Sequence, residues 1–548
     1  MLENESLSTD ILVVGSGIAG MIAAIEARKA GAEVVLASRS KLGKESSTAV
    51  ARTFAFGSEE ETRGRNMPGY DNKPGKYIED WTLVRSLTEE APGQIENLIR
   101  LGVPMVRIPA DKGYEKLPAY RPKGSDVSHG GAIVLDILGP VASNLGIRVV
   151  EGCQITNLLR DEGRIAGASG LRQDGGWLSI HARAVILATG GAAGMSEVTC
   201  SSREVCGNGY AMALRAGISL KNMEFNEYYP VGLPTPRGQY VHCAPLTLMM
   251  KGACLRNEAG EDVVKKHFGI SVQEAMPTTT MRFDWLPRAV ALEMERGKVY
   301  LDLTGVPAED WDRLPERNWR QIRQTHVDMK MTPLPIMPMS IAFRGGISVD
   351  ARMQSSLAGL YAAGEVVGGW MAWERWLGYL TACLAMGAIA GRKAVAGIEG
   401  AKAPRKAGLV DEGLDEARAV SKGKGETDPG EVGDEIRRVV YRYGGPVRSA
   451  ASLGEGLRKL DDLTARATGF RCGGISELRD ALDAKAMLLA ARAVLKASVV
   501  RTESRGGFFR RDFPDRNDKD WLRPIMVSCD RASGEVRAEP GKKLVLPK

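Results

Sequence analysis

The feature that most constrains the fold is a glycine-rich turn close to the start of the chain. Residues 11–14 are consecutive apolar residues that lead directly into Gly15, Gly17 and Gly20. An alanine-rich run with helical spacing and a second β-branched run over residues 32–36 follow, and this pattern predicts a strand–helix–strand unit. In such a unit the three glycines allow a tight turn, close approach of a pyrophosphate, and close helix–strand packing. Because the first N–H groups of the helix face the phosphates, the unit predicts a dinucleotide site.

The second predicted strand ends without the acidic residue that usually binds ribose hydroxyls at this point. Ser38 and Arg39 stand there instead, and Ser38 still offers one hydrogen-bonding group. The following segment, residues 43–51, is small and polar, as is typical of a loop that closes over a flavin. A lone Gly-x-Gly-x-x-Gly also fits an ordinary turn, but its place between two apolar runs favours the dinucleotide site.

The whole chain resembles the flavoprotein family of fumarate reductase, succinate dehydrogenase, L-aspartate oxidase and adenylylsulfate reductase. Besides the glycine-rich turn, three motifs carry the resemblance: VILATGG at residues 185–191, GLYAAGE at 359–365, and ESRG at 503–506 running into RRDFP at 510–514. They stand in the family's order. No single motif is decisive, but together they extend from residue 11 to residue 514.

The resemblance implies an α/β fold. A Rossmann-like FAD-binding domain would carry an inserted α+β capping domain and be followed by a C-terminal helical domain. The Gly- and charge-rich segment after residue 401 has the composition of a linker. The expected boundaries are 1–224 for the first part of the FAD-binding domain, 225–345 for the capping and substrate domain, 346–401 for the second part of the FAD-binding domain, 402–434 for the linker, and 435–548 for the C-terminal helical domain and tail.

Composition excludes several other classes of protein. With 44% hydrophobic and 26% charged residues in 548, the chain is neither disordered nor fibrous. A net charge of +7 without a dense Lys/Arg run argues against nucleic acid and favours a small anionic substrate or an acidic partner. Eight cysteines without a Cys-x-x-Cys pair argue against an internal metal site.

The N-terminus has neither the basic nor the apolar segment of a secretory signal, and the longest uncharged apolar stretch, residues 376–391, is too short to span a bilayer. We therefore expect a cytoplasmic protein with no membrane span of its own, whose membrane association, if any, is made through a partner.

By resemblance the cofactor is FAD. Relatives that attach it covalently use a Ser-His-Thr segment, and this chain has Ser46-Ser47-Thr48 there, so we expect non-covalent FAD. Asn208 replaces the acid of the family's Gly-Asp-Gly, and the family places Glu365 on the ribityl chain. The residues expected to contact FAD are Gly15, Gly17, Ala19, Gly20, Ser38, Arg39, Ser46, Ser47, Thr48, Ala188, Thr189, Gly190, Gly191, Asn208, Gly364, Glu365 and Leu380.

The substrate-facing positions depart from the family, which usually holds a dicarboxylate with two histidines and two arginines. Tyr229 stands where the first histidine precedes proline, and residues 337–346 contain no histidine. Arg375 matches the clamping arginine, and Arg282 or Arg288 falls near the proton-donating one. An arginine acts as an acid only where a dry, cation-rich site lowers its pKa. The alternative role for these arginines is in salt bridges of the cap.

Three tryptophans near Arg375, at positions 370, 373 and 376, predict a substrate flatter or larger than succinate. We therefore expect an FAD-dependent oxidoreductase that transfers hydride between flavin N5 and an anionic substrate other than plain succinate or fumarate. The alternatives are an adenylylsulfate-reductase-like reaction and an electron-transfer subunit of a larger complex. The C-terminal resemblance implies an iron–sulfur protein partner, against the alternative of a stand-alone oxidase like L-aspartate oxidase.

Overall fold

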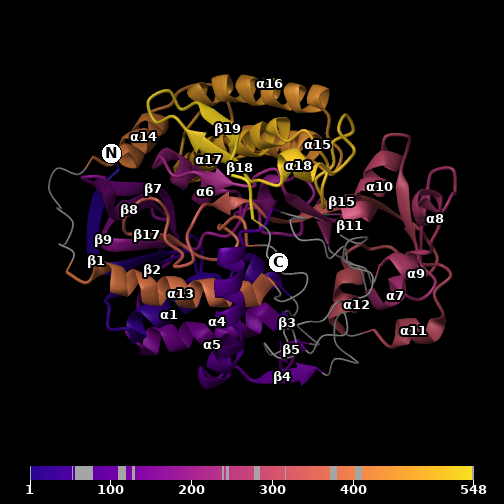
Figure 1. Cartoon of the computed structure of the whole chain (residues 1–548), viewed down its shortest axis with the longest axis horizontal. Helices are drawn as coiled ribbons and strands as arrows, with labels where there is room; N and C mark the ends of the chain where they lie inside the picture. The colour runs from indigo at the N-terminus through magenta and orange to yellow at the C-terminus, as the bar shows by residue number, and fades with distance from the viewer. Residues whose placement is uncertain are drawn as a thin grey trace.

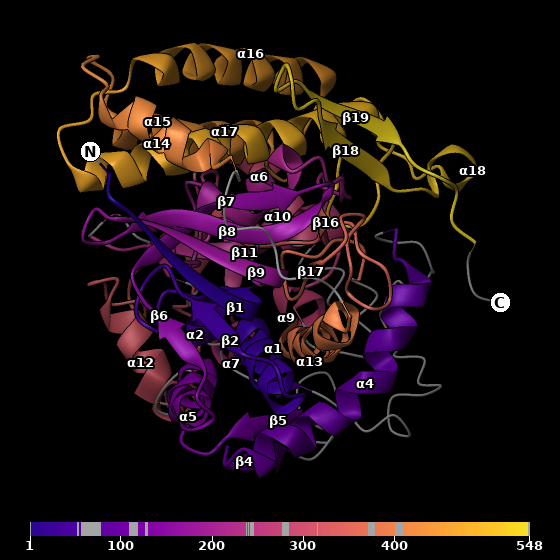
Figure 2. The same ribbon diagram turned by 90° about the vertical axis from the view of Figure 1, so that its left-hand side faces the viewer.

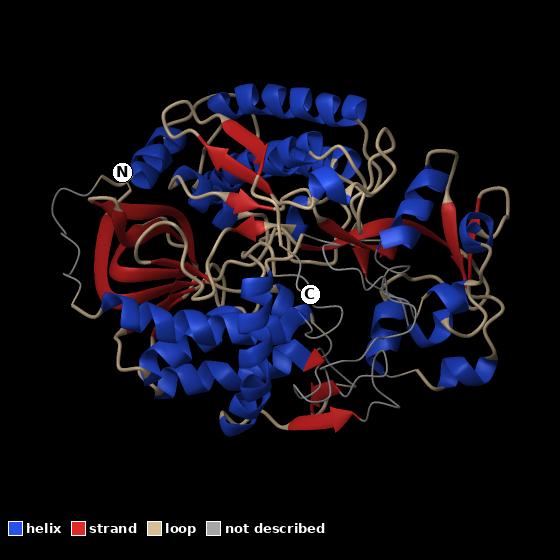
Figure 3. Ribbon diagram, viewed as in Figure 1, coloured by secondary structure: helices blue, strands red, loops and turns tan. Residues whose placement is uncertain are grey.

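The computed structural model of the chain has three regions that pack together (Figure 1). A central sheet with its helices forms one region, a second sheet with short helices lies beside it, and long C-terminal helices lie across the top of the view. Figure 3 separates the strands of the two sheets from the surrounding helices. The structure describes residues 2–51, 54–55, 78–108, 119–125, 130–236, 238, 240–241, 246–276, 284–314, 316–370, 379–400 and 410–545.

The central sheet turns the apolar runs of the sequence into adjacent buried strands. Its spatial order is β6 (Arg148–Val150), β2 (Val34–Ala37), β1 (Asn4–Val14), β9 (Trp177–Leu187), β8 (Arg164–Arg172) and β7 (Cys153–Asp161), and β17 (Leu360–Ala362) also pairs with β9. β1 runs parallel to β2 and β9, whereas β8 is antiparallel to β9. Only the last residues of β1 are fully buried, and they precede the glycine-rich turn. The carboxyl ends of β1, β2 and β9 therefore meet at one edge, where ligands bind in such sheets.

Helices cover both faces of this sheet, as the turned view shows (Figure 2). One face carries α1 (Ile18–Lys29), α4 (Trp81–Arg100), α5 (Gly130–Asn144) and α13 (Tyr379–Ile398). The backbones of α1 and α13 approach closely, because a Cβ on Gly387 would lie 2.4 Å from the Ala19 carbonyl oxygen. A short three-stranded sheet of β3 (Phe54–Ala55), β5 (Ala119–Pro122) and β4 (Met105–Ile108) lies beside α4 and α5.

α13 includes most of the uncharged apolar stretch noted in the sequence and continues past Arg392 and Lys393 to Ile398. Within the described residues it is the helix whose length and composition would allow it to cross a membrane. In the fold, 72% of its apolar segment is buried, and it packs against α1, α4 and β9. Its apolar character is thus accounted for by packing inside the protein.

The inserted segment has a sheet and a core of its own. Its antiparallel strands, in order, are β12 (Tyr240–Val241), β11 (Asn226–Pro234), β15 (Leu334–Phe343), β14 (Val299–Asp302) and β13 (Cys254–Asn257). The helices around it are α7 (Leu246–Met249), α8 (Val263–Phe268), α9 (Val272–Ala275), α10 (Leu286–Met294), α11 (Ala308–Asp312) and α12 (Glu316–Arg323). Its buried side chains form a hydrophobic cluster distinct from that of the central sheet. We call this segment, residues 225–345, the cap.

The C-terminal region is mostly helical: α14 (Glu412–Ser421), α15 (Pro429–Tyr443), α16 (Ala450–Arg466), α17 (Ile475–Val500) and α18 (Asp518–Trp521). α14 lies within the segment expected to be a linker, where Leu414 and Ala417 pack against Trp177. The tail also forms strands β18 (Ile525–Cys529) and β19 (Val536–Pro540). They join β10 (Leu220–Lys221) and β16 (Gly346–Ile347), which flank the cap in sequence, so the tail braces the base of the cap.

A buried chain of charges lies at the same junction. Arg501 donates to Glu224 at 2.7 Å and to Glu503 at 2.8 Å, and the four side chains of Glu224, Arg501, Glu503 and Arg505 are fully buried. Arg505 completes the chain by pairing with Glu503. The ESRG motif therefore has a structural role at the junction of cap, central sheet and tail.

Candidate functional site

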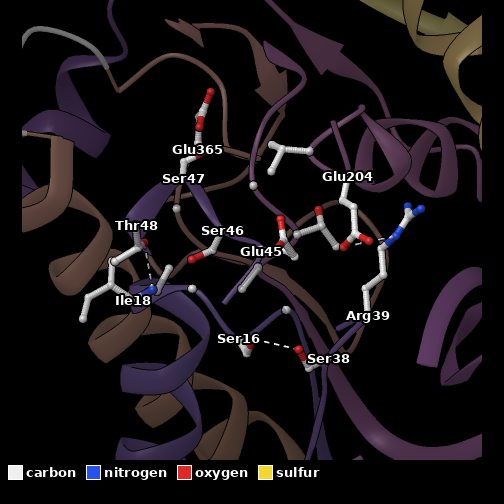
Figure 4. Close-up of a pocket in the computed structure, with 18 of the residues that line it drawn as sticks. Ser16, Ile18, Ser38, Arg39, Glu45, Ser46, Ser47, Thr48, Glu204 and Glu365 are labelled. Atoms are coloured by element: carbon white, nitrogen blue, oxygen red, sulfur yellow. Dashed lines mark hydrogen bonds and ion pairs between the residues drawn. The ribbon is translucent and has the colours of Figure 1, made fainter. Parts of the chain in front are cut away.

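A pocket at the carboxyl edge of the central sheet collects most residues singled out from the sequence (Figure 4). The expected cofactor contacts on its wall are Gly15, Gly17, Ala19, Ser38, Arg39, Ser46, Ser47, Thr48, Ala188, Thr189, Gly190, Asn208, Gly364, Glu365 and Leu380. Gly20 and Gly191 lie directly behind the wall. A Cβ on Gly20 would be 1.8 Å from the Gly15 carbonyl oxygen, and one on Gly191 would be 2.2 Å from a Glu365 carboxyl oxygen.

The middle of the pocket suits a pyrophosphate. Gly15 has φ +111°, and its Cβ would lie 2.3 Å from the Ala188 carbonyl oxygen, so only glycine fits. Gly17 caps α1 without a side-chain hydrogen bond, and the first turn carries no acidic residue. Thr48, from the short helix α2 (Ser47–Val50), accepts the Ile18 N–H at 3.2 Å. The start of α1 thus leaves backbone donors for an anionic group.

The end of the pocket beside β2 supplies acidic groups that sequence reasoning missed. Glu204 lies on the wall near Arg39, with 3.6 Å between Arg39 Nε and Glu204 Oε2 (Figure 4). Asp483 of α17 accepts hydrogen bonds from Arg39 at 2.8 Å, Gln154 at 2.7 Å and Asn208 at 3.0 Å. Burial works to lower the pKa of Arg39, but Asp483 outweighs it and raises that pKa. Glu204 thus places a carboxyl group on the wall beside Arg39, and Asp483 pairs with Arg39 without lining the pocket itself.

The other end of the pocket reaches the cap at Ile341 and Ala342, and Tyr379 and Glu365 also line this end. The Glu365 carboxyl accepts the Phe343 N–H at 3.0 Å, and burial raises its pKa to about 7. Thr189 Oγ1 is buried and finds no hydrogen-bond partner within the described part of the chain. A polar ligand group on this wall would satisfy it.

The substrate-facing residues expected from the sequence are not gathered on the described wall of this pocket. Tyr229 is 2% exposed and belongs to the hydrophobic core of the cap. The Arg288 guanidinium, on α10, lies over the Phe509 ring at 4.6 Å, and burial lowers its pKa. Arg282 and Arg375 lie outside the described residues, so their expected roles stay predictions.

Comparison with known proteins decides the family. A model described as an FAD binding domain matches residues 10–378, and one described as the fumarate reductase flavoprotein C-term matches residues 433–543. The chain belongs to the fumarate reductase/succinate dehydrogenase flavoprotein family. A relative from Methanothermobacter marburgensis, named as one subunit of a fumarate reductase (CoM/CoB), is 28% identical over 96% of this chain and 98% of its own length.

Solved structures agree with the family's fold. Mycobacterium smegmatis Sdh1, in complex with UQ1, is 27% identical with a TM-score of 0.83, covering 99% of this chain and 95% of that one. Adenylylsulfate reductase from Archaeoglobus fulgidus covers 100% and 97% with a TM-score of 0.75, and its 18% identity makes this a likeness of fold alone. This member of the flavoprotein family is therefore an FAD-dependent oxidoreductase with a Rossmann-like domain, an inserted cap and a C-terminal helical region.

The pocket residues fit FAD as a non-covalent ligand. Among the described residues on its wall there is no histidine, and Ser47 lies 3.2 Å from the Ser201 hydroxyl. The wall also carries buried Cys153, Cys206 and Cys383, and burial raises the pKa of each thiol to about 12, which leaves them unreactive at neutral pH.

Precipitation of the purified flavoprotein with acid is expected to release all of its FAD, because the described wall offers no reactive nucleophile to the cofactor. The measurement is the flavin absorbance of the supernatant against that of the redissolved pellet. Yellow, fluorescent polypeptide in the pellet would show a covalent bond and contradict this prediction.

Proposed function

We propose that this flavoprotein carries out a two-electron reaction on a small anionic substrate other than plain succinate or fumarate. The observation that carries the proposal is the wall of the pocket on the cap side. Ile341 and Ala342 of β15 lie there, in the segment where the family has its second histidine. The position of the first is taken by Tyr229, which is packed into the core of the cap.

Bound FAD supplies the hydride acceptor or donor of such a reaction. The chain's own residues position and shield it. The glycine-rich turn and the start of α1 hold the pyrophosphate, Glu365 offers its carboxyl to sugar-like hydroxyls, and Ile341 keeps water from the cap side. We propose that Arg375 clamps the acidic group of the substrate and that Arg282 or Arg288 supplies the proton. The lowered pKa of Arg288, caused by burial, is the direction that an acid requires.

Succinate dehydrogenation and fumarate reduction are expected to be slow. Each hydrogen-bond donor lost from a substrate carboxylate costs about 1–3 kcal/mol, so two losses lower kcat/KM roughly a hundredfold or more. The measurement compares kcat/KM for both compounds with a family member that keeps both histidines, assayed in parallel. Equal rates would contradict the proposed pocket.

A second set of assays separates the alternatives on the FAD-loaded protein. Reduction of bound FAD by sulfite plus AMP would favour an adenylylsulfate-reductase-like reaction, and reduction only through a partner would favour an electron-transfer role within a complex.

Once a substrate is found, Arg375→Ala is expected to abolish its turnover while FAD stays bound.

We also infer that the chain works with an iron–sulfur protein. The relative from M. marburgensis is named as one subunit of an enzyme, and residues 433–543 match the fumarate reductase C-terminal model. The eight cysteines lack cluster-binding spacing, so onward one-electron transfer needs another protein.

The protein isolated from its own cells is expected to co-purify with an iron–sulfur protein and, once reduced, to react slowly with oxygen. Rapid reoxidation of a protein without a partner would favour a stand-alone oxidase.

A further inference from the structure

The half-buried Tyr379 and the buried Glu227 and Arg344 form a cluster where the pocket meets the cap. We propose that these residues form a proton relay, in which Tyr379 exchanges a proton with the pocket and the Glu227 carboxylate stores it. The inference deepens the proposed function, because it adds a proton store on the cap side of the pocket to the arginine proposed to exchange a proton with the substrate. It involves none of the arginines discussed above.

Three separate segments bring the cluster together. Tyr379 is the first residue of α13 and lies on the pocket wall. Glu227 is on β11, and Arg344 directly follows β15. The Tyr379 hydroxyl donates to Glu227 Oε2 at 2.6 Å, and Arg344 Nη2 lies 2.9 Å from the same oxygen. One carboxylate oxygen thus connects a pocket hydroxyl to a buried cation.

The burial of the pair is the reason to look for a function. The side chains of Arg344 and Glu227 are only 3% and 2% exposed. Removing two charges from water costs several kcal/mol for each ion, and their mutual attraction often does no more than offset this cost. A buried ion pair is therefore a poor device for stability. Placed behind a pocket hydroxyl, it supplies a carboxylate that can receive a proton.

The hydroxyl is held in place for this role. The Trp370 ring meets the Tyr379 ring edge-on, with centroids 5.4 Å apart and an angle of 89°. Trp370 is itself fixed, because its Nε1 donates to the Val367 carbonyl at 2.8 Å. Burial first, and then the charge of Glu227, raise the pKa of Tyr379 well above its ordinary value. The Tyr379 phenol therefore stays protonated. It gives its proton to Glu227 only when it receives another proton from the pocket.

The step balances in protons and electrons. When the reaction in the pocket releases a proton, this proton bonds to the Tyr379 oxygen. At the same time the original O–H bond of Tyr379 breaks and its proton moves to Glu227 Oε2. Bound FAD would take up the two electrons, and in the reverse direction the same residues would return the proton to the pocket. Arg344 keeps its charge throughout. Among the described residues, Glu365 on the pocket wall is a further acidic group that acts on Tyr379.

Glu224 offers a matched control. It is also a fully buried glutamate that pairs with an arginine, Arg501, at 2.7 Å, but it does not line the pocket. Glu224→Gln therefore removes a buried Glu–Arg pair without touching the relay. Should Glu227→Gln alone fail to fold, the double variant Glu227→Gln/Arg344→Met removes both charges at similar side-chain volume and leaves no unpaired cation.

The test uses FAD-loaded protein and an electrode, without any substrate. Spectroelectrochemical titration between pH 6 and 8 gives the number of protons taken up per two electrons. The wild type is expected to take up one proton more than Glu227→Gln or the double variant, and Glu224→Gln is expected to match the wild type. Tyr379→Phe should slow this uptake at least tenfold in stopped-flow mixing with a pH indicator.

Midpoint potentials provide a second readout. Glu227→Gln is expected to raise the flavin potential and Arg344→Met to lower it, each by at least a tenfold change in the reduction equilibrium, or about 30 mV. Equal proton counts in wild type and Glu227→Gln would overturn the relay, as would the same loss in Glu224→Gln. Because no substrate is used, a failed search for an anionic substrate would overturn the proposed function and leave this result standing.

Discussion

Gly20→Ala is expected to yield a protein that no longer retains FAD. The added Cβ would lie 1.8 Å from the carbonyl oxygen and 2.9 Å from the carbonyl carbon of Gly15, which are both rigid backbone atoms. α1 would have to move away from the turn, and its first N–H groups would move with it. Such overpacking costs about 1–3 kcal/mol. Because the displaced groups are those that face the pyrophosphate, the Kd for FAD should rise roughly 10- to 100-fold.

Gly454→Ala is the matched control for this prediction. Gly454 lies inside α16, and no atom would come within 4 Å of its added Cβ. Alanine there should leave FAD bound and stabilise the protein by about 0.5–1 kcal/mol. The FAD-to-protein ratio after purification, FAD titration of the apoprotein and urea unfolding measure these effects. Full FAD binding by Gly20→Ala would mean that the turn does not hold the cofactor.

The parts of the fold that follow local patterns were predictable. The glycine-rich turn joins β1 to α1 as the spacing indicated, and the C-terminal region expected to be helical contains α15, α16 and α17. α14 was missed for a physical reason: its charged, glycine-containing sequence looks like a linker. Its apolar side is short and consists of Leu414, Ala417 and the partly buried Val420. It is stable because these residues pack in the cluster around Trp177, while Asp411 accepts the Trp177 Nε1–H at 2.9 Å.

The site was predictable only where one motif forms it. The wall around Gly15 and Gly17 comes from a single turn, whereas the Arg39–Asp483 pair joins positions 444 residues apart. No motif or residue spacing in the sequence predicts such a pair. The absence of an acid after β2 was visible in the sequence, but the presence of Glu204 on the pocket wall depends on how a distant loop folds back to the pocket.

Strand β11 shows a second limit. Glu227 and Tyr229 are two residues apart and would share a face in a regular strand. The register of β11 against β15 shifts between Glu227 and Tyr228, so the regular alternation is broken there. β11 is also buried along almost its whole length, and its sequence therefore lacks the apolar–polar alternation that would assign faces. Glu227 meets Tyr379 of the pocket wall, whereas Tyr229 packs in the cap.

Glu365→Gln is expected to stabilise the apoprotein at pH 8. Burial, with a further contribution from Glu227, raises the pKa of Glu365 from about 4.5 to about 7. A carboxyl whose pKa is higher in the folded state binds its proton more tightly there, so its contribution to stability is complete below pH 4.5 and is lost as pH rises towards 7. The loss amounts to about 3 kcal/mol at pH 8, and glutamine avoids it because it never ionises.

The same substitution is expected to weaken FAD binding, because a carboxylate accepts hydrogen bonds from hydroxyls more strongly than an amide does. Hydrogen bonds to charged groups contribute about 1.5–3 kcal/mol, so the Kd for FAD at pH 8 should rise roughly 10- to 100-fold. Urea unfolding of the apoprotein at pH 5 and pH 8 and FAD titration at pH 8 measure the two effects, with exposed Glu96→Gln as control. The ionised Glu365 would then destabilise the folded apoprotein and strengthen FAD binding. If the variant gained no stability at pH 8, burial of the Glu365 carboxylate would not destabilise the folded apoprotein. If the Kd for FAD were unchanged, Glu365 would not contact FAD.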